Sequence, residues 1–409
     1  MEKFSGSFTQ QEPIPQAGID AALAVMQSGR LHRYNTVAGE TAETALLEQE
    51  FAAYLGAKYC LAVASGGYAL GAALRALGVA AAEPVLTNAF TLAPVPGAIA
   101  AVGARPVFVE TTEDLTIDFA HLAQMARETG ARVLMLSHMR GHLADMPALM
   151  DLCRGLGLRV IEDCAHTMGA DWAGVPSGRF GDIACFSTQT YKHMNSGEGG
   201  LITTDDPDLA ARCVLLSGSY MLYPRHLAAP EPEAFEALRM EIPNVSGRMD
   251  NLRAAILRPQ IALLPERRDR WTRLHDVMQD GLAHTPGLRL THRPSEERHV
   301  ASSFQFLLPE WEAGRITALL AACAARGVEL KWFGADMPAA FTSRYDHWRY
   351  AQPQSLPQTD RVLSGLIDMR LPLTFSTEDV ALIARIIRAE VLRHGQMAEI
   401  ESAAIPTAD

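Results

Sequence analysis

Lys192 stands between a hydroxyl-rich run and a glycine cluster in the stretch STQTYKHMNSGEGG, which covers residues 187–200. No carboxylate lies directly beside it to pair its charge, and the glycines let the backbone approach another group closely. A lysine amine that is held neutral can attack a carbonyl carbon. Because a lone lysine is more often a surface residue, this interpretation depends on what accompanies Lys192.

Two further features lie earlier in the chain. The turn Ser65-Gly66-Gly67 follows an apolar run and precedes a helix pattern, so its N–H groups can hold a phosphate. Asp163 ends the apolar run RVIED, and open α/β sheets bind ligands at the carboxyl ends of their strands. Considered alone, the turn at residues 65–67 would be interpreted as an ordinary strand-to-helix turn, and Asp163 as a charge that faces solvent.

Their order along the chain favours a site for pyridoxal 5'-phosphate. That cofactor needs a carboxylate that keeps its ring nitrogen protonated, an amine that reacts with its aldehyde, and donors for its phosphate. Asp163 suits the first role and Lys192 the second. Gly66, Gly67 and Ser187 suit the third.

Helix-period and strand-period segments alternate from residue 41 to about 206, with strands expected at 59–64, 132–137, 159–164, 182–187 and 200–206. Strand–helix–strand units predict parallel strands covered by helices. We expect a large α/β domain over residues 1–262, including an N-terminal arm. A smaller α+β domain should cover residues 263–409, with a loose tail after Gln396.

Composition narrows the function classes. The 409 residues are 48% hydrophobic with a net charge of −11 and no long basic run, so nucleic acid is not an expected partner. No stretch of about 20 apolar residues occurs, so no membrane span is expected and the chain should be cytoplasmic. The six cysteines are scattered singly, which favours buried thiols and no metal site.

The segment VIEDCAHTMGADWAGVPSGRFGDIACFSTQTYKHMNSGEGGLITTDD resembles the DegT/DnrJ/EryC1/StrS aminotransferases, and the resemblance runs along nearly the whole chain. It implies a fold-type-I transferase that binds pyridoxal 5'-phosphate. In that family Lys192 would form the Schiff base and Asp163 would hold the ring nitrogen. Ser187 and the Gly66-Gly67 amides would bind phosphate. A homodimer with active sites at the subunit interface is also implied.

Several residues refine the resemblance. His166, where many relatives have glutamine, and Gln189 are similar to the branch of 3-amino-5-hydroxybenzoate synthase and the inosose aminotransferases. Gly67 replaces a usual threonine, and Leu92 replaces the aromatic that stacks on the ring, a role that Phe90 could take. In NVSGRMDN, Arg248 matches a residue that reaches the second subunit's site, whereas Ser246 replaces asparagine.

We therefore expect an aminotransferase that moves an amino group from glutamate or glutamine to a ketone, a keto sugar or cyclitol of specialised metabolism. In the loop SHMRGHLADM, His138 and Arg140 are the substrate candidates, and a purely structural loop is the alternative. Two other functions stay open: an aminotransferase or lyase for a non-sugar ketone or aldehyde, and a non-catalytic regulatory protein of the same fold.

Overall fold

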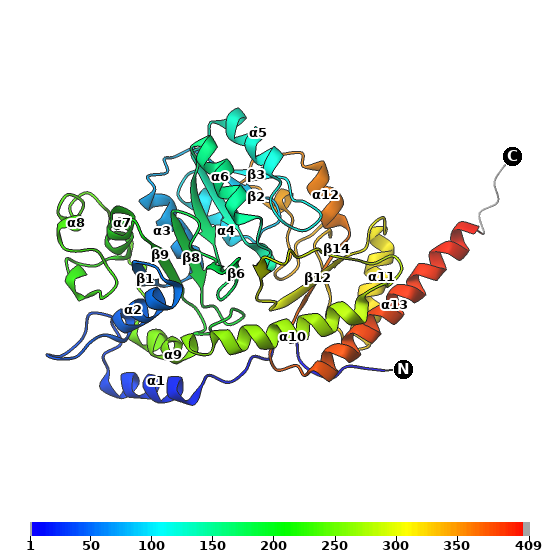
Figure 1. Ribbon diagram of the computed structural model, residues 1–409, viewed down its shortest axis with the longest axis horizontal. Helices are drawn as coiled ribbons and strands as arrows, with labels where there is room; N and C mark the ends of the chain where they lie inside the picture. Colours follow the sequence, from blue (N-terminus) through cyan, green and yellow to red (C-terminus); the bar gives the residue numbers. More distant parts are fainter. Residues whose placement is uncertain (1, 404–409) are drawn as a thin grey trace.

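The computed structural model describes the backbone of residues 2–403 and the side chains of residues 2–395. A seven-stranded sheet forms its centre (Figure 1). Its strands, in spatial order, are β1 (Tyr59–Val63), β9 (Gly200–Thr204), β8 (Ile183–Ser187), β5 (Arg159–Asp163), β4 (Val133–Ser137), β2 (Pro84–Asn88) and β3 (Arg105–Val109). Within this sheet only β9 is antiparallel to its neighbours β1 and β8, so the sheet is mainly parallel, as predicted.

Helices cover both faces of this sheet. Val133 and Met135 of β4 join a core with helices α3, α4 and α7, whereas Leu134 and Leu136 face α5 and α6. Apolar residues on both faces explain why the strands read as continuous apolar runs. The helices of this part of the chain are α1 (Gln16–Ser28), α2 (Glu43–Leu55), α3 (Gly66–Ala76), α4 (Pro94–Ala101), α5 (Phe119–Thr129), α6 (Met146–Leu156), α7 (Pro207–Ser217), α8 (Glu233–Glu236) and α9 (Asn251–Ile261).

A second, four-stranded sheet lies in the C-terminal part of the chain. Its antiparallel strands run in the order β10 (Arg289–Leu290), β12 (Ser303–Leu307), β14 (Leu366–Arg370) and β13 (Lys331–Trp332). The helices here are α10 (Leu264–Leu282), α11 (Ala313–Ala325), α12 (Pro357–Ser364) and α13 (Thr377–Ala403). A small sheet of β11 (Glu297–Arg298), β6 (Asp171–Trp172) and β7 (Val175–Pro176) joins residues from both parts of the chain.

The expected domain division at residues 262 and 263 falls between α9 and α10, and it stays a prediction. The first residues of the N-terminal arm pack against the C-terminal part of the chain: the rings of Phe4 and Phe8 each lie 5.0 Å from the ring of Phe375, measured between centroids. The tail after Gln396 was expected to be loose, but α13 continues to Ala403. The alanine and glutamate residues in that last segment favour helix. The rest of that tail, residues 404–409, lies outside the described residues.

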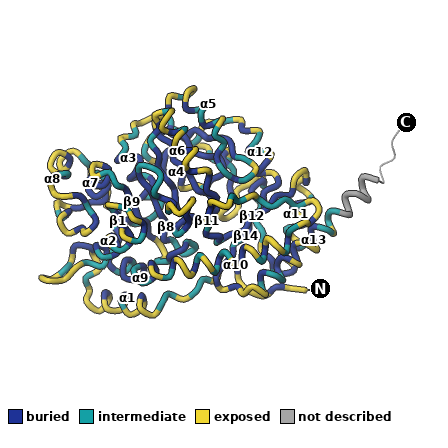
Figure 2. The backbone as a smooth tube through the Cα atoms, viewed as in Figure 1, coloured by how far each residue is buried: buried dark blue, intermediate teal, exposed yellow. Residues whose placement is uncertain are grey.

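Burial agrees with this architecture. In Figure 2 the strands of the large sheet are coloured as buried, whereas exposed residues gather on the outer helices such as α1 and α8. All six cysteines are buried free thiols, as predicted. In the described part of the chain, no helix combines the length and the apolar character that a membrane span needs.

Candidate active site

A cavity of about 570 Å³ opens where several strands of the large sheet end. A smaller cavity of about 80 Å³ shares part of its lining and reaches the ends of β4 and β5. The larger one is lined by residues of both parts of the chain, including Gly66, Gly67, Arg140, His166, Ser187, Gln189, Lys192, Phe341 and Arg370. Most residues proposed from sequence for cofactor binding therefore come together in one place.

Lys192 lies in the loop between β8 and β9. Its backbone N–H donates to the carbonyl oxygen of Gln189 at 2.8 Å, a bond that shapes this loop. Its Nζ lies 2.8 Å from Nε2 of His166. Burial lowers the pKa of Lys192 to about 8; Asp163 opposes this shift, whereas Arg140 and Arg370 add to it. The amine is therefore neutral far more often than that of an exposed lysine.

Asp163 ends β5 with its carboxylate at the smaller cavity. Its Oδ2 accepts a hydrogen bond from Ser137 Oγ at 3.0 Å, and its Oδ1 accepts one from the Ala165 N–H at 3.2 Å. Burial raises the pKa of Asp163, while the charge of Lys192 acts in the opposite direction. Ser137 was not proposed from sequence, although it ends β4 and pairs in register with Asp163.

The glycine turn packs against the end of β8. Ser65 caps α3 because its Oγ accepts the N–H of Tyr68 at 3.0 Å. A Cβ added to Gly66 would lie 2.9 Å from Cβ of Ser187, so only glycine fits there without a shift. Gly67 faces open space, with its nearest neighbour Ser65 Oγ at 4.0 Å from such an added atom. The free N–H groups of a helix N-terminus and the Ser187 hydroxyl thus border one cavity.

Leu92, and not Phe90, lines both cavities. The ring of Phe90 is buried and lies 5.1 Å from the ring of Phe333, edge to face, between centroids. The expected stacking of Phe90 on a cofactor ring is therefore not supported by its position. Strand alternation puts residues two apart on the same side only while the backbone stays extended, and β2 ends at Asn88.

Ser246 and Arg248 do not line the cavity of their own chain. Arg248 donates through Nη1 to the carbonyl oxygens of Ser217 at 3.2 Å and Gly218 at 2.9 Å. Its Nη2 donates to Ser246 Oγ at 3.3 Å. Their expected contact with the site of a second subunit stays a prediction.

The two substrate candidates of the loop after β4, Arg140 and His138, lie in different surroundings, and so does their neighbour His142. Arg140 lines the cavity, and its Nη2 lies 2.8 Å from Oδ2 of Asp368 in a buried ion pair. His138 does not line the cavity. Its Nε2 donates to Oε2 of the buried Glu162 at 3.1 Å, so its position does not support the expected substrate role. His142 bonds to Gln305 Oε1 at 3.0 Å and borders a different cavity.

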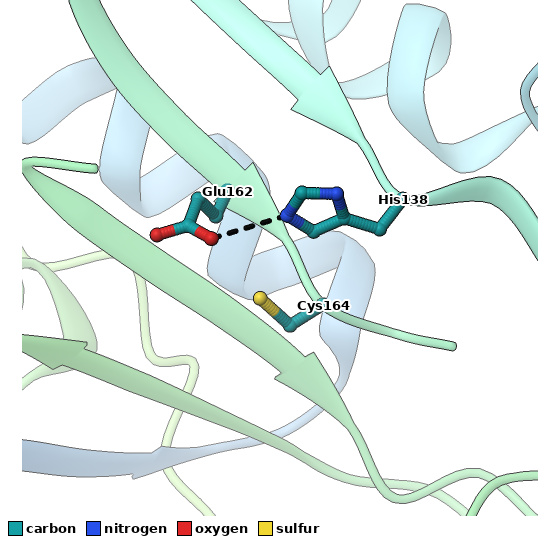
Figure 3. Close-up of side chains that lie close together, drawn as sticks. All are labelled: His138, Glu162 and Cys164. Carbon is teal, nitrogen blue, oxygen red and sulfur yellow. Dashed lines mark hydrogen bonds and ion pairs between the residues drawn. The ribbon is translucent and has the colours of Figure 1, made fainter. Parts of the chain in front are cut away.

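His138, Glu162 and Cys164 form a compact buried group with ligand atoms within 4.8 Å of one another (Figure 3). Both carboxylate oxygens of Glu162 are already used. Oε1 accepts the N–H groups of Phe180 and Gly181 at 2.8 and 2.6 Å, and Oε2 accepts that of Gly178 at 3.0 Å in addition to the bond from His138. These four donors account for the burial of the carboxylate as part of a structural hydrogen-bond network.

Sequence reasoning did not propose the residues that the C-terminal part of the chain brings to the cavity. Arg370, at the end of β14, places its guanidinium carbon 3.6 Å from the centroid of the Tyr191 ring. Phe341 and Trp271 also line the cavity. Nothing local in the sequence links Arg370 to Lys192.

Comparison with known proteins decides the family. The model of the DegT/DnrJ/EryC1/StrS aminotransferase family matches residues 15–388. The chain belongs to this family. Aminotransferases of the DegT/DnrJ/EryC1/StrS family use pyridoxal 5'-phosphate.

Two relatives illustrate the likeness. The L-glutamine:2-deoxy-scyllo-inosose aminotransferase of Streptomyces fradiae is 32% identical over 279 residues, which are 68% of this chain and 65% of that protein. The dTDP-3-amino-3,4,6-trideoxy-alpha-D-glucose transaminase of Streptomyces venezuelae is 34% identical over 279 residues, or 67% of this chain and 68% of that protein. The chain thus matches about two thirds of the length of these curated relatives.

The fold of this family member is also that of a solved structure of 3-amino-5-hydroxybenzoic acid synthase. The superposition has a TM-score of 0.81 and covers 95% of this chain and 99% of that one, at 24% identity. The likeness shows a fold-type-I aminotransferase architecture, as predicted.

The residues of this family member fit pyridoxal 5'-phosphate. Gly66 lacks a Cβ where one would press on Ser187, and Gly67 leaves open space beside the helix N-terminus. The buried Asp163 carboxylate borders the same small cavity as Lys192. Phosphate donors, a carboxylate and an amine therefore surround one space, and each is of the type that the cofactor requires.

Proposed function

We propose that this protein is a pyridoxal-phosphate-dependent aminotransferase that moves an amino group from glutamate or glutamine to a ketone on a keto sugar or cyclitol. The observation that carries the proposal is the convergence of Lys192, Asp163 and the Gly66-Gly67 turn on one buried space. The names of the relatives, an inosose aminotransferase and a sugar transaminase, support the class of acceptor.

When bound, the cofactor supplies an aldehyde that reacts with amines and a ring that accepts electrons. Lys192 is the residue that would hold it covalently and afterwards carry a proton on Nζ between substrate and cofactor. A pKa of about 8 suits both tasks, because the amine gains and loses a proton readily near neutral pH. Nε2 of His166, 2.8 Å away, orients Nζ.

Asp163 would keep a proton on the ring nitrogen through its carboxylate. Ser137 donates to Oδ2 and the Ala165 N–H donates to Oδ1, so two hydrogen bonds fix the orientation of the carboxylate. Ser187 and the N–H groups of Gly66 and Gly67 would bind the phosphate, and Leu92 would lie against the ring. These assignments give the aldehyde, the ring nitrogen, the ring face and the phosphate of the cofactor a partner from this chain.

A non-catalytic regulatory role is the second candidate, and the presence of both Lys192 and Asp163 in one site disfavours it. We also propose that the protein acts in the cytoplasm as a homodimer. Ser246 and Arg248 would then serve the site of the partner subunit, which agrees with their position away from the cavity of their own chain.

An absorption spectrum of the purified protein before and after addition of glutamate or glutamine tests the proposal. A visible band that changes with donor indicates an aminotransferase, and an unchanging band indicates a binder. Lys192→Ala should abolish turnover, while Lys58→Ala, an exposed control, should not. Amination assays with inososes, nucleotide-linked keto sugars and long-chain ketones then identify the acceptor class; activity on the long-chain ketones alone would contradict the carbohydrate assignment.

A further inference from the structure

Two cationic side chains lie against aromatic rings that line the cavity. The guanidinium carbon of Arg370 lies 3.6 Å from the centroid of Tyr191 and 4.9 Å from that of Phe341. Nζ of Lys331, on the neighbouring strand β13, lies 5.5 Å from the same Phe341 centroid. Tyr191 precedes Lys192, so this cluster adjoins the reactive amine.

The charges of this cluster are not balanced within the chain. Asp368 is buried and faces Arg140 at 2.8 Å, where it also accepts a hydrogen bond from Gln305 Nε2 at 2.8 Å. Among the described residues, neither Arg370 nor Lys331 forms an ion pair with a carboxylate. Glu198 is the acidic residue among those that line the cavity, and it is exposed.

Burial is the main cause that lowers the pKa of Lys331 to about 8. The charges of Arg370 and Arg140 add to this shift, whereas Asp368 and Glu329 oppose it. An anion bound between these groups would relieve the repulsion and replace the water that their charges lose on burial. A guanidinium stacked on a ring keeps its N–H edge free, and that edge matches a carboxylate or phosphate.

We propose that Arg370, supported by Lys331, is the anion subsite of this cavity and selects substrates that carry a carboxylate or phosphate. Arg140, the candidate from sequence, is already neutralised by Asp368 and therefore is not the main anion-binding residue. The identity of the substrates rests on the proposed function, because the anionic group belongs either to the amino-acid donor or to the ketone acceptor.

Binding of two unreactive probes to the holoenzyme tests the subsite. Glutarate carries two carboxylates, and glutaramide is its neutral equivalent of similar shape. By calorimetry the wild type should bind glutarate at least about tenfold more tightly than glutaramide, the effect expected of one hydrogen-bonded charge pair. Arg370→Gln should remove most of this preference, and Arg370→Lys should restore part of it.

Matched variants keep the result interpretable. Arg349→Gln removes an exposed arginine from the segment beside the cavity and should leave glutarate binding unchanged. Lys331→Gln should weaken glutarate binding by a few-fold and serves as the test if Arg370→Gln does not fold. If Arg370→Gln binds glutarate as tightly as the wild type does, the proposal is overturned. The same holds for Lys331→Gln where that variant is used in its place. If Arg349→Gln loses as much glutarate affinity as Arg370→Gln, the proposal is also overturned, because the loss would then reflect the overall charge of the protein.

Competition against bound glutarate shows whether the anionic group belongs to the amino-acid donor or to the ketone acceptor. Displacement by glutamine assigns the subsite to the donor, and displacement by fructose 6-phosphate but not by fructose assigns it to the acceptor. If neither displaces glutarate, the subsite does not serve these substrates and the proposal fails. The absorbance change with glutamate or glutamine is independent: its absence would end the aminotransferase proposal while glutarate binding through Arg370 could still stand.

Discussion

The amine of Lys192 should be acetylated at neutral pH much faster than an ordinary lysine once the cofactor is removed. Burial lowers its pKa from 10.5 to about 8. At pH 7.5 roughly a quarter of the amine is then neutral, against about 0.1% for an unperturbed lysine. The structure thus predicts an excess of about 200-fold in reactive amine at that pH, before any difference in access of the reagent.

Competitive labelling of the apoprotein with trace acetic anhydride measures this directly. Peptide mass spectrometry at a series of pH values from about 6 to 11 gives the titration of Lys192, with the exposed Lys58 as internal reference. The midpoint should lie near 8. Asp163→Asn should move it lower still, because the carboxylate of Asp163 favours the charged amine.

A midpoint near 10.5 would refute the reasoning, since it would mean that Nζ stays hydrated in the apoprotein. An unchanged midpoint in Asp163→Asn would refute the assigned coupling between the two residues. Stability offers a second check with a defined sign. Because the folded-state pKa lies below the unfolded value of 10.5, the unfolded chain binds more protons in this range. Stability of the apoprotein should therefore rise as the pH increases from about 8 to about 10.5.

Three other substitutions have defined outcomes. Asp163→Asn should fold, as a thermal melt can confirm, but lose most of its turnover in a steady-state assay, because an amide cannot balance a protonated ring nitrogen; turnover near that of the wild type would contradict the role. Ser187→Ala should weaken cofactor retention by about 1.5–3 kcal/mol, measured by equilibrium dialysis, and an unchanged dissociation constant would contradict phosphate binding. Asp368→Asn leaves the buried guanidinium of Arg140 without its partner and should destabilise the fold by about 3–5 kcal/mol in denaturant titrations, whereas the double variant Arg140→Met/Asp368→Leu should recover much of that loss.

The site could be predicted from sequence where its residues end successive elements of the large sheet. Gly66 follows β1, Asp163 ends β5 and Ser187 ends β8, and strand ends of one parallel sheet meet at one edge. Ser137 belongs to the same set, since it ends β4, but a serine at a strand end carries no distinctive signal of its own. The contact of His138 could not be predicted, because the direction of a loop side chain depends on its partner, here the buried Glu162.

The sequence by itself predicted the mainly parallel sheet, because apolar runs of strand length alternate with helix patterns. The family followed from the resemblance of the segment around Lys192 to known aminotransferases. A glycine turn before a helix, a carboxylate at a strand end and a lysine beside glycines made Lys192 and Asp163 the candidates for their roles, which stay predictions. Only the tertiary structure decided which arginine is already paired, because Arg140 and Asp368 are separated by more than 200 residues. The same holds for Arg370, which reaches Tyr191 only after the second sheet packs beside the first. Packing between distant segments sets charge balance and burial, and no local pattern carries that information.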